Sequence, residues 1–267
     1  MSTQPHVLAE VKDGIGWLTL NRPDQLNALS MEMRELLIEH TAKFEKDPAV
    51  RCVVIRGSGT HFMAGGDIEG FHESLTTERE AHLAAFEMRV VKVHQAIYQI
   101  RRMQKPVLAS VQGAAAGFGL SLILNCDLAI ASDDSFFTLA YPHIGLSADG
   151  GATYFLPRVV GERKALEIAL LGERFSAQEA KDNNILNWVV PKDQLVAETA
   201  KMARKLADGP TFALGVAKSL IRNSFDNSWD EHSHREAEGL AACAATEDHF
   251  EGLSAFLEKR KPAFKGR

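Results

Sequence analysis

Two kinds of hydrophobic pattern alternate along the chain. Short continuous apolar runs bounded by glycine, proline or charged residues are typical of buried strands, whereas apolar residues at every third or fourth position are typical of helices. Both kinds occur up to about residue 192, and only the helical kind follows. The pattern therefore predicts an α/β unit over residues 1–192 and a helical region over residues 193–267.

The apolar runs that we expect to be strands are residues 7–11, 15–20, 52–57, 107–111, 127–131, 136–139 and 188–190. Lys12, Asp13 and Gly14 separate the first two runs, a spacing that predicts a hairpin. A helical pattern lies between the second and third runs, so these two strands should be parallel and joined by a right-handed crossover.

The helical patterns of the first unit cover residues 31–44, 85–103, the stretch after Gly117, and 162–171. Ser30 is a candidate N-cap of the first helix, and Ser176 with Glu179 has the spacing of a capping box. Residues 70–85 show only weak periodicity, which predicts a mobile polar loop or a frayed helix, and residues 141–157 are expected to be loop and turn.

Small residues fill two turns that follow predicted buried strands. The first turn is Met63-Ala-Gly-Gly-Asp-Ile68, and the second is Gly113-Ala-Ala-Ala-Gly117. Such turns let another molecule approach the backbone, and the first N–H groups of a helix are free to bind an anion or a polarised carbonyl oxygen. Two turns can each supply one donor to the same oxygen; tight packing between a helix and a sheet is the alternative explanation for the second one.

Composition excludes several classes of protein. Hydrophobic residues make up 45% of the chain and charged residues 24%, as in ordinary globular proteins, and the net charge of −5 argues against a nucleic-acid binder. Cys52, Cys126 and Cys243 are odd in number and widely spaced, which indicates reduced thiols. The first residues lack the features of a secretion signal, and no apolar run reaches the roughly 20 residues of a membrane span. We therefore expect a cytoplasmic protein with no membrane partner.

At these motifs the chain resembles the enoyl-CoA hydratase/isomerase (crotonase) family. The matching blocks, in family order along the whole chain, are Leu20-Asn-Arg-Pro23 with Asn27-Ala28, Met63-Ala-Gly-Gly-Asp-Ile68, Lys105-Pro-Val-Leu-Ala-Ser-Val-Gln-Gly113, Cys126-Asp-Leu-Ala-Ile-Ala131 and Ile144-Gly-Leu-Ser-Ala-Asp-Gly-Gly151. The resemblance implies a spiral of strand–strand–helix turns, followed by helices that build a homotrimer or a dimer of trimers. It also implies an acyl-CoA thioester substrate, with coenzyme A as part of that substrate and no metal or other cofactor.

The shared chemistry of the resembled family is an oxyanion hole of two backbone N–H groups that holds the thioester oxygen as an enolate forms. Carried onto this chain, the two donors are Gly66 and Phe118. Typical hydratases of the family carry two glutamates, whose positions correspond here to Ser121 and Tyr141, so the two-glutamate mechanism is in doubt. The carboxylate that does occur is Asp149, at a position where some double-bond isomerases of the family place an aspartate.

The pattern around Asp149 and near the C-terminus looks most like ring-1,2-epoxyphenylacetyl-CoA isomerases. The expected activity is therefore a double-bond shift or a ring-epoxide opening, with Asp149 as the proton carrier. The alternatives are an enoyl-CoA hydratase with other acids and a non-catalytic acyl-CoA binder. By the same resemblance, a dehalogenase is disfavoured because the positions of its histidine and tryptophan correspond to Phe86 and Tyr141. A serine hydrolase is disfavoured because Ser121 lacks the Gly-x-Ser-x-Gly elbow.

The resemblance also assigns residues that bind the substrate and its coenzyme A. Two loops and two residues of the last helical segment contribute to this set, and Phe256 and Lys259 belong to it because in family trimers they can reach a neighbour's CoA. Asp67 is expected to cap a turn, and His82 and His143 are expected to be structural. The full set is Arg22, Gln25, Ala28, Ala64, Asp67, Ile68, Gly117, Tyr141, Phe256 and Lys259.

Overall fold

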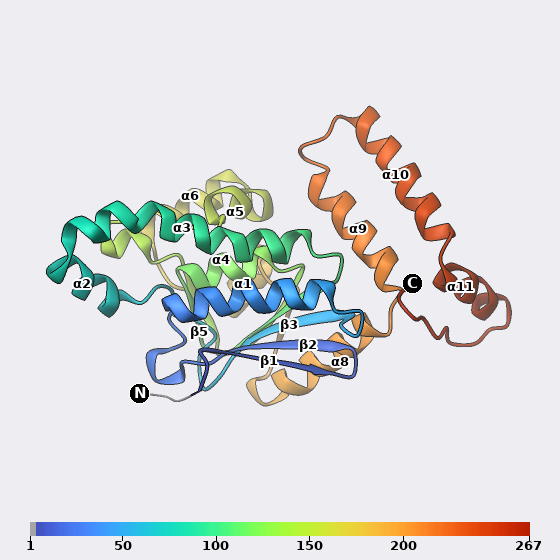
Figure 1. The fold of residues 1–267 in the computed structure, drawn as a ribbon, viewed down its shortest axis with the longest axis horizontal. Coiled ribbons are helices and arrows are strands. Elements are labelled where there is room, and N and C mark those ends of the chain that lie inside the picture. The colour runs from blue at the N-terminus through green and yellow to red at the C-terminus, as the bar shows by residue number, and fades with distance from the viewer. Residues whose placement is uncertain (1–3) are drawn as a thin grey trace.

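Six strands form the larger sheet, in the order β1-β2-β3-β4-β6-β9 (Figure 1). The computed structural model describes residues 4–267; residues 1–3, at the start of the predicted first unit, lie outside the described residues. The strands are β1 (Val7–Lys12), β2 (Ile15–Leu20), β3 (Cys52–Gly57), β4 (Val107–Val111), β6 (Leu128–Ser132) and β9 (Trp188–Val190). β1 and β2 are antiparallel and the other neighbours are parallel, so the predicted hairpin and the predicted parallel crossover are confirmed.

A second, smaller sheet holds the order β5-β7-β8, with β5 (Ala114–Ala116), β7 (Phe136–Thr138) and β8 (Phe175–Ser176). Met63 extends this sheet by an isolated parallel bridge to Ala115. After β3, β4 and β6, the chain therefore crosses from the larger sheet into the smaller one before it enters a helix. This repeated order is the strand–strand–helix turn that the resemblance implied.

The helices are α1 (Met31–Lys46), α2 (Ile68–Thr77), α3 (Arg79–Arg102), α4 (Phe118–Asn125), α5 (Ala152–Val160), α6 (Glu162–Leu171), α7 (Ala177–Asp182), α8 (Leu195–Ala207), α9 (Thr211–Asn223), α10 (Trp229–Ala244) and α11 (Glu247–Leu257), with short 3₁₀ turns η1 (Pro23–Gln25), η2 (Tyr141–Ile144) and η3 (Lys192–Gln194). Ser30 caps α1 by accepting from the Met33 N–H at 3.1 Å. Ser176 and Glu179 form a complete capping box at α7. Both predicted caps are confirmed.

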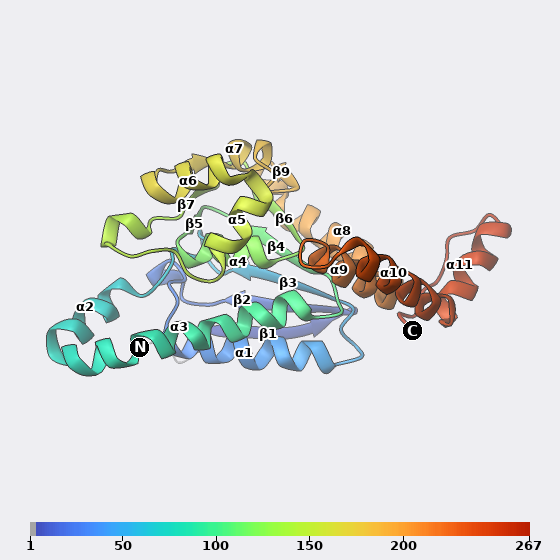
Figure 2. The ribbon, with the colours of Figure 1, turned by 90° about the horizontal axis from the view of Figure 1, so that it is seen from above.

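Alternate residues of the central strands face two hydrophobic layers. Val53 and Ile55 belong to the main core, which also contains residues of α1, α3 and α4, whereas Cys52 and Val54 pack in a smaller cluster with α8. Figures 1 and 2 show α1 and α3 on one side of the larger sheet and α8 on the other. Every residue of α4 is buried, so α4 is the central helix of the fold.

Two sequence predictions about local structure are wrong, and a third is narrowed to one of its two alternatives. Residues 70–85, expected to be a mobile polar loop or a frayed helix, are helical, in α2 and α3; their periodicity is weak because α2 buries none of its residues. Residues 152–157 belong to α5 and not to loop, although two glycines precede this helix and Pro157 lies inside it. Ala114–Ala116 forms strand β5, where a simple turn was expected.

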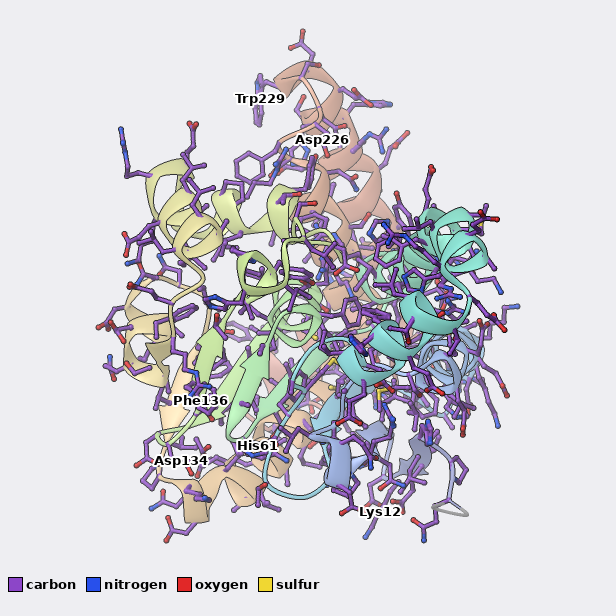
Figure 3. The ribbon with its side chains drawn as sticks, turned by 90° about the vertical axis from the view of Figure 1, so that its left-hand side faces the viewer. Lys12, His61, Asp134, Phe136, Asp226 and Trp229 are labelled. Carbon is purple, nitrogen blue, oxygen red and sulfur yellow. The ribbon has the colours of Figure 1, made fainter. Side chains whose placement is uncertain are left out.

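The C-terminal helices extend away from the rest of the molecule. Figures 1 and 2 show α10 and α11 reaching outward beyond α9, with no strand among them. Figure 3 shows the turn between α9 and α10, marked by Asp226 and Trp229, at the opposite edge of the molecule from His61 and Asp134. Among residues 4–267, no helix is both long and apolar enough to cross a membrane. Cys52 and Cys126 are buried free thiols and Cys243 is a half-buried one.

Candidate active site

The two glycine turns pack directly against each other. A Cβ atom on Gly65 would lie 3.3 Å from the carbonyl oxygen of Ala116, and one on Gly117 would lie 3.4 Å from the Cα of Gly65. Both glycines also have positive φ angles, +98° and +51°. Glycine is required here because it tolerates positive φ and allows this close approach. The contact brings Gly66 and Phe118, the residues that follow these two glycines, close to each other.

The N–H groups of Gly66 and Phe118 are free to bind a ligand. Within residues 4–267, neither group donates a hydrogen bond to another backbone or side-chain atom. Both residues line one cavity of about 500 Å³. Phe118 is the first residue of α4 and Gly66 precedes the N-cap of α2, and unpaired backbone N–H groups of this kind are suited to stabilise negative charge on an oxygen.

Asp149 lines the same cavity, and two polar contacts fix its position. The Tyr141 hydroxyl donates to Asp149 Oδ1 at 2.5 Å, and the Ser121 hydroxyl donates to the Asp149 carbonyl at 2.9 Å. Asn125, one turn further along α4, donates to the Gly150 carbonyl at 2.8 Å. The buried helix α4 therefore holds the Asp149 loop through its own side chains.

Burial changes the acidity of this pair. It raises the pKa of the Asp149 carboxyl, while the Tyr141 hydrogen bond and the nearby charge of His94 act in the opposite direction. Burial and the neighbouring carboxylate also raise the pKa of the Tyr141 hydroxyl, so tyrosine stays a donor. A carboxyl group with a raised pKa in a water-poor cavity is suited to take up and return a proton.

Most of the remaining wall is apolar and comes from α1, α2, α3, η2 and the loops beside them. Its hydrophobic members are Leu29, Met31, Ile68, Phe71, Phe86, Val90, Val93, Ile144 and Leu146. A cavity with such walls and a few polar groups at one end suits an apolar ligand that carries a carbonyl group.

Comparison with known proteins identifies the family. The profile of the enoyl-CoA hydratase/isomerase family matches residues 10–267. The chain belongs to this family. It is 36% identical to 1,2-epoxyphenylacetyl-CoA isomerase of Escherichia coli over 98% of both chains, and 30% identical to 4-chlorobenzoyl coenzyme A dehalogenase-2 of an Arthrobacter species over 95% of this chain and 91% of that one. The crystal structure of an enoyl-CoA hydratase from Polaromonas, 32% identical, superposes with a TM-score of 0.90 and covers 97% of this chain and 99% of that chain.

The predicted crotonase-type α/β fold is thereby confirmed, as is the prediction that the chain is an enzyme of this family. The relatives include isomerases, hydratases and dehalogenases, so they share the family and differ in the reaction. The choice between these reactions rests on the residues of the site.

The residues that the crotonase resemblance assigned to coenzyme A lie in two loops that brace each other. Arg22 donates to the Ala28 carbonyl at 2.7 Å and pairs with Asp67 at 3.0 Å. Asp67 also caps α2 by accepting from the Gly70 N–H at 3.1 Å, as the sequence predicted. Ala64 donates its N–H to the Leu26 carbonyl at 3.0 Å. These contacts hold the two loops against each other.

The structure places the other predicted binding residues in two groups. Asp67 and Ile68 line the cavity with Tyr141, and Gly117 is the N-cap of α4 next to it. Gln25 is exposed on η1. Phe256 is 83% exposed on α11, and Lys259 follows that helix, so neither reaches the cavity of its own chain. Their assignment to a neighbour's CoA stays a prediction.

One cavity residue that the sequence analysis did not single out is His94 of α3. Its Nε2 atom is buried and has no hydrogen-bond partner in the described part of the chain. Val90, Val93 and Ile97 share its helix face, so the helical spacing of this apolar face was the signal that could have found it. His94 is a cavity histidine at a position other than Phe86, where the resemblance placed the dehalogenase histidine.

The two histidines considered from sequence have local contacts. His82 is not in a loop; it is buried in α3, 3.3 Å from an Arg89 nitrogen. His143 lies 2.9 Å from the Gly172 carbonyl. Both positions agree with the structural roles expected of them. Among residues 4–267, no group of three or more His, Cys, Asp or Glu side chains could hold a metal ion.

Proposed function

We propose that this enzyme is an acyl-CoA isomerase that works through an enolate. The observation that carries the proposal is the half-buried Asp149 carboxyl group, whose pKa is raised, in the cavity that the free N–H groups of Gly66 and Phe118 also line. The other cavity carboxylate, Asp67, is already occupied by the α2 N-terminus and Arg22. Asp149 is thus the group best suited to exchange a proton with the substrate.

In the proposed reaction, the thioester oxygen accepts hydrogen bonds from the Gly66 and Phe118 N–H groups. The Asp149 carboxylate removes a proton from the carbon next to the thioester, and the electron pair moves into the enolate. The protonated Asp149 then returns that proton two carbons further along, so the double bond shifts without net gain or loss of atoms. Where a ring epoxide lies beside the enolate, the same electron pair breaks one C–O bond of the epoxide, and the protonated Asp149 returns its proton to the oxygen that leaves. Each backbone donor contributes roughly 10²–10³ in rate in comparable sites.

Tyr141 and Ser121 support an isomerase over a two-glutamate hydratase. At these positions the side chains hold Asp149 instead of a water molecule, because the Tyr141 hydroxyl contacts its carboxylate and the Ser121 hydroxyl contacts its carbonyl. An enoyl-CoA hydratase with other acids remains the runner-up. His94 beside Asp149 favours, as a second alternative, attack by Asp149 on a halogenated aromatic acyl group.

One set of spectroscopic assays distinguishes these reactions. We would follow the purified enzyme with crotonyl-CoA, a 3-enoyl-CoA, an epoxyphenylacetyl-CoA and 4-chlorobenzoyl-CoA. Turnover of the 3-enoyl or epoxide ester, with crotonyl-CoA unchanged and Asp149→Asn inactive, supports the isomerase. Fast hydration of crotonyl-CoA that survives Asp149→Asn contradicts it, and chloride release from 4-chlorobenzoyl-CoA supports the dehalogenase.

We also propose that the enzyme is cytoplasmic and forms a homotrimer or a dimer of trimers, and that it needs no cofactor beyond the CoA of its substrate. The exposed apolar side chains of the C-terminal helices support assembly, because Leu240, Phe250 and Phe256 are each at least 75% exposed. Sedimentation of the purified protein tests the oligomeric state.

A further inference from the structure

A second cavity, of about 830 Å³, lies between α3, α5 and α9. Its wall includes Arg101 and Arg102 of α3, Arg158 of α5 and Arg222 of α9. In contrast to the apolar cavity at Asp149, this cleft is rich in positive charge.

Cations outnumber carboxylates in this cleft. Among its lining residues in the described part of the chain, the one carboxylate is Asp226, which accepts a hydrogen bond from the Tyr154 hydroxyl at 3.1 Å, whereas the cations are Arg101, Arg102, Arg158, Lys218 and Arg222. Asp127 is shared by Lys218 at 2.8 Å and Arg222 at 2.5 Å. Within the described residues, no carboxylate forms an ion pair with Arg101 or Arg158, and the Nη1 atom of Arg222 is buried with no hydrogen-bond partner. Burial, together with the charge of Arg222, lowers the pKa of Arg101 to about 10. Burying a guanidinium without a partner is costly, so an anion bound here would be stabilised.

Two of these guanidinium groups stack on aromatic rings. The Arg101 guanidinium lies 3.6 Å from the centre of the Phe155 ring, and that of Arg158 lies 3.5 Å from the centre of the Tyr154 ring. Arg158 donates through Nη1 to the Tyr154 carbonyl at 2.8 Å, and stacking leaves the remaining N–H groups at the edges of the two guanidinium planes available to a planar acceptor. Guanidinium edges bind carboxylates in this way.

The cleft adjoins the proposed active site. His94 lines both cavities, and the turn that holds Asp149 in one of them holds Gly151 in the other. Arg101 follows His94 by about two turns of α3, which corresponds to roughly 10 Å along the helix. An extended acyl chain that passes His94 can therefore place its far end beside the arginines.

We infer that the cleft formed by Arg101, Arg158 and Arg222 binds a carboxylate at the far end of the acyl group, so that the substrates include dicarboxylic acyl-CoA esters. This inference rests on the proposed acyl-CoA site and adds the class of acyl group that it accepts. A free anion such as inorganic phosphate has the same attraction for the cleft, so the experiment separates the two sources.

The test compares the affinities of octanoyl-CoA and suberyl-CoA, two esters of equal chain length of which the second ends in a carboxylate. Calorimetry with the Asp149→Asn enzyme measures binding without turnover. We expect suberyl-CoA to bind about tenfold more tightly or better, as charge-assisted pairs in partly buried sites do. Arg101→Gln and Arg158→Gln should bring the ratio of the two affinities close to one. Arg163→Gln, an exposed arginine of α6 outside both cavities, is the charge-matched control and should keep the ratio.

Arg158 is exposed, so its substitution tests the inference even if Arg101→Gln destabilises the fold. Equal affinity for the two esters in the parent protein overturns the inference. If inorganic phosphate then binds and Arg101→Gln abolishes that binding, the cleft is a free-anion site; if phosphate does not bind either, it is not an anion site. Failure of octanoyl-CoA to bind at all would instead count against the proposed acyl-CoA function.

Discussion

At the scale of single residues, Asp149 combines burial with a need for charge. Its carboxyl group must ionise to remove a proton, yet burial favours the neutral form and raises its pKa. The Tyr141 hydroxyl, at 2.5 Å, partly compensates by stabilising the ionised form. Burial of an ionised group lowers the folding stability of the protein, and such a loss is common at reactive sites.

Asp149→Asn should therefore inactivate the enzyme and stabilise its fold. We expect kcat/KM to fall by about 10²–10⁴, the contribution typical of a general acid or base. Because the pKa is raised in the folded state, the folded protein binds this proton more tightly than the unfolded chain does. Its free energy of unfolding therefore decreases as pH rises from the usual value of 3.8 through the raised one. The melting temperature of the variant should exceed that of the wild type at neutral pH, and the gap should shrink in acid. A variant that melts lower at neutral pH contradicts this account.

His94 should set the pH at which Asp149 ionises. The charge of His94 lowers the pKa of Asp149, so His94→Gln should raise that pKa and move the acid limb of the kcat/KM profile to higher pH. His72→Gln, an exposed histidine on α2, is the control and should leave the limb in place. An unshifted profile for His94→Gln, with the fold intact by circular dichroism, would show that the two groups do not interact in solution.

At the scale of elements, the N–H donors depend on backbone geometry. Gly117 has φ +51° and ψ −120°, a conformation that residues with a side chain strongly disfavour. A Cβ atom there would lie 3.4 Å from the Cα of Gly65. Gly117→Ala should move the start of α4, and with it the Phe118 N–H. We expect a loss of roughly 10²-fold in kcat and a destabilisation of about 1–3 kcal/mol.

Gly161→Ala is the matched control for backbone strain. Gly161, between α5 and α6, also has a positive φ, +79°, but a Cβ atom there meets nothing within 4 Å. This variant should lose stability and keep kcat. If both variants lose stability equally and neither loses kcat, the Phe118 N–H does not contribute to the reaction. Stopped-flow kinetics and denaturant unfolding of the two proteins decide between these outcomes.

Elements with a complete local signal were predictable, and those shaped by distant contacts were not. The strands 52–57 and 107–111 are buried on both faces, so their sequences are mostly apolar, with Arg56 and Ser110 as the polar members. Helix α1 carries its own cap at Ser30. In contrast, α5 follows two glycines and contains Pro157, so its local signal indicated a loop. Its helical form depends on packing of Ala152 and Leu156 into the main core.

The same distinction applies to the candidate site. The two glycine turns could be found because close approach requires small residues, which are visible in the sequence. The family resemblance was needed to assign Gly66, Phe118 and Asp149. His94 was missed because a single polar residue on an otherwise apolar helix face does not change the helical pattern. The arginine cleft was missed because its cations come from α3, α5 and α9, which are far apart in sequence.

At the scale of the whole molecule, the C-terminal helices lack an apolar partner within the chain. Leu240 is 75% exposed on α10, and on α11 Phe250 is 75% and Leu257 79% exposed. Figures 1 and 2 show these helices extending away from the sheets. Burying each such side chain is worth about 1.5–3 kcal/mol, so a surface of this kind is expected to be covered by another copy of the chain.

Leu240→Glu and Phe250→Glu should therefore dissociate the proposed trimer. A charge at a buried contact is costly, whereas the same charge on a solvent-exposed helix is tolerated, so the effect on assembly distinguishes the two situations. Glu238→Gln, an exposed position on α10, is the control and should leave assembly unchanged. Sedimentation velocity is the measurement. If the wild type sediments as a monomer, or if both apolar-to-charged variants assemble like the control, these helices do not form the interface. If the variants dissociate and also lose affinity for CoA esters, Phe256 and Lys259, which lie outside their own chain's cavity, gain support as contacts to a neighbour's CoA.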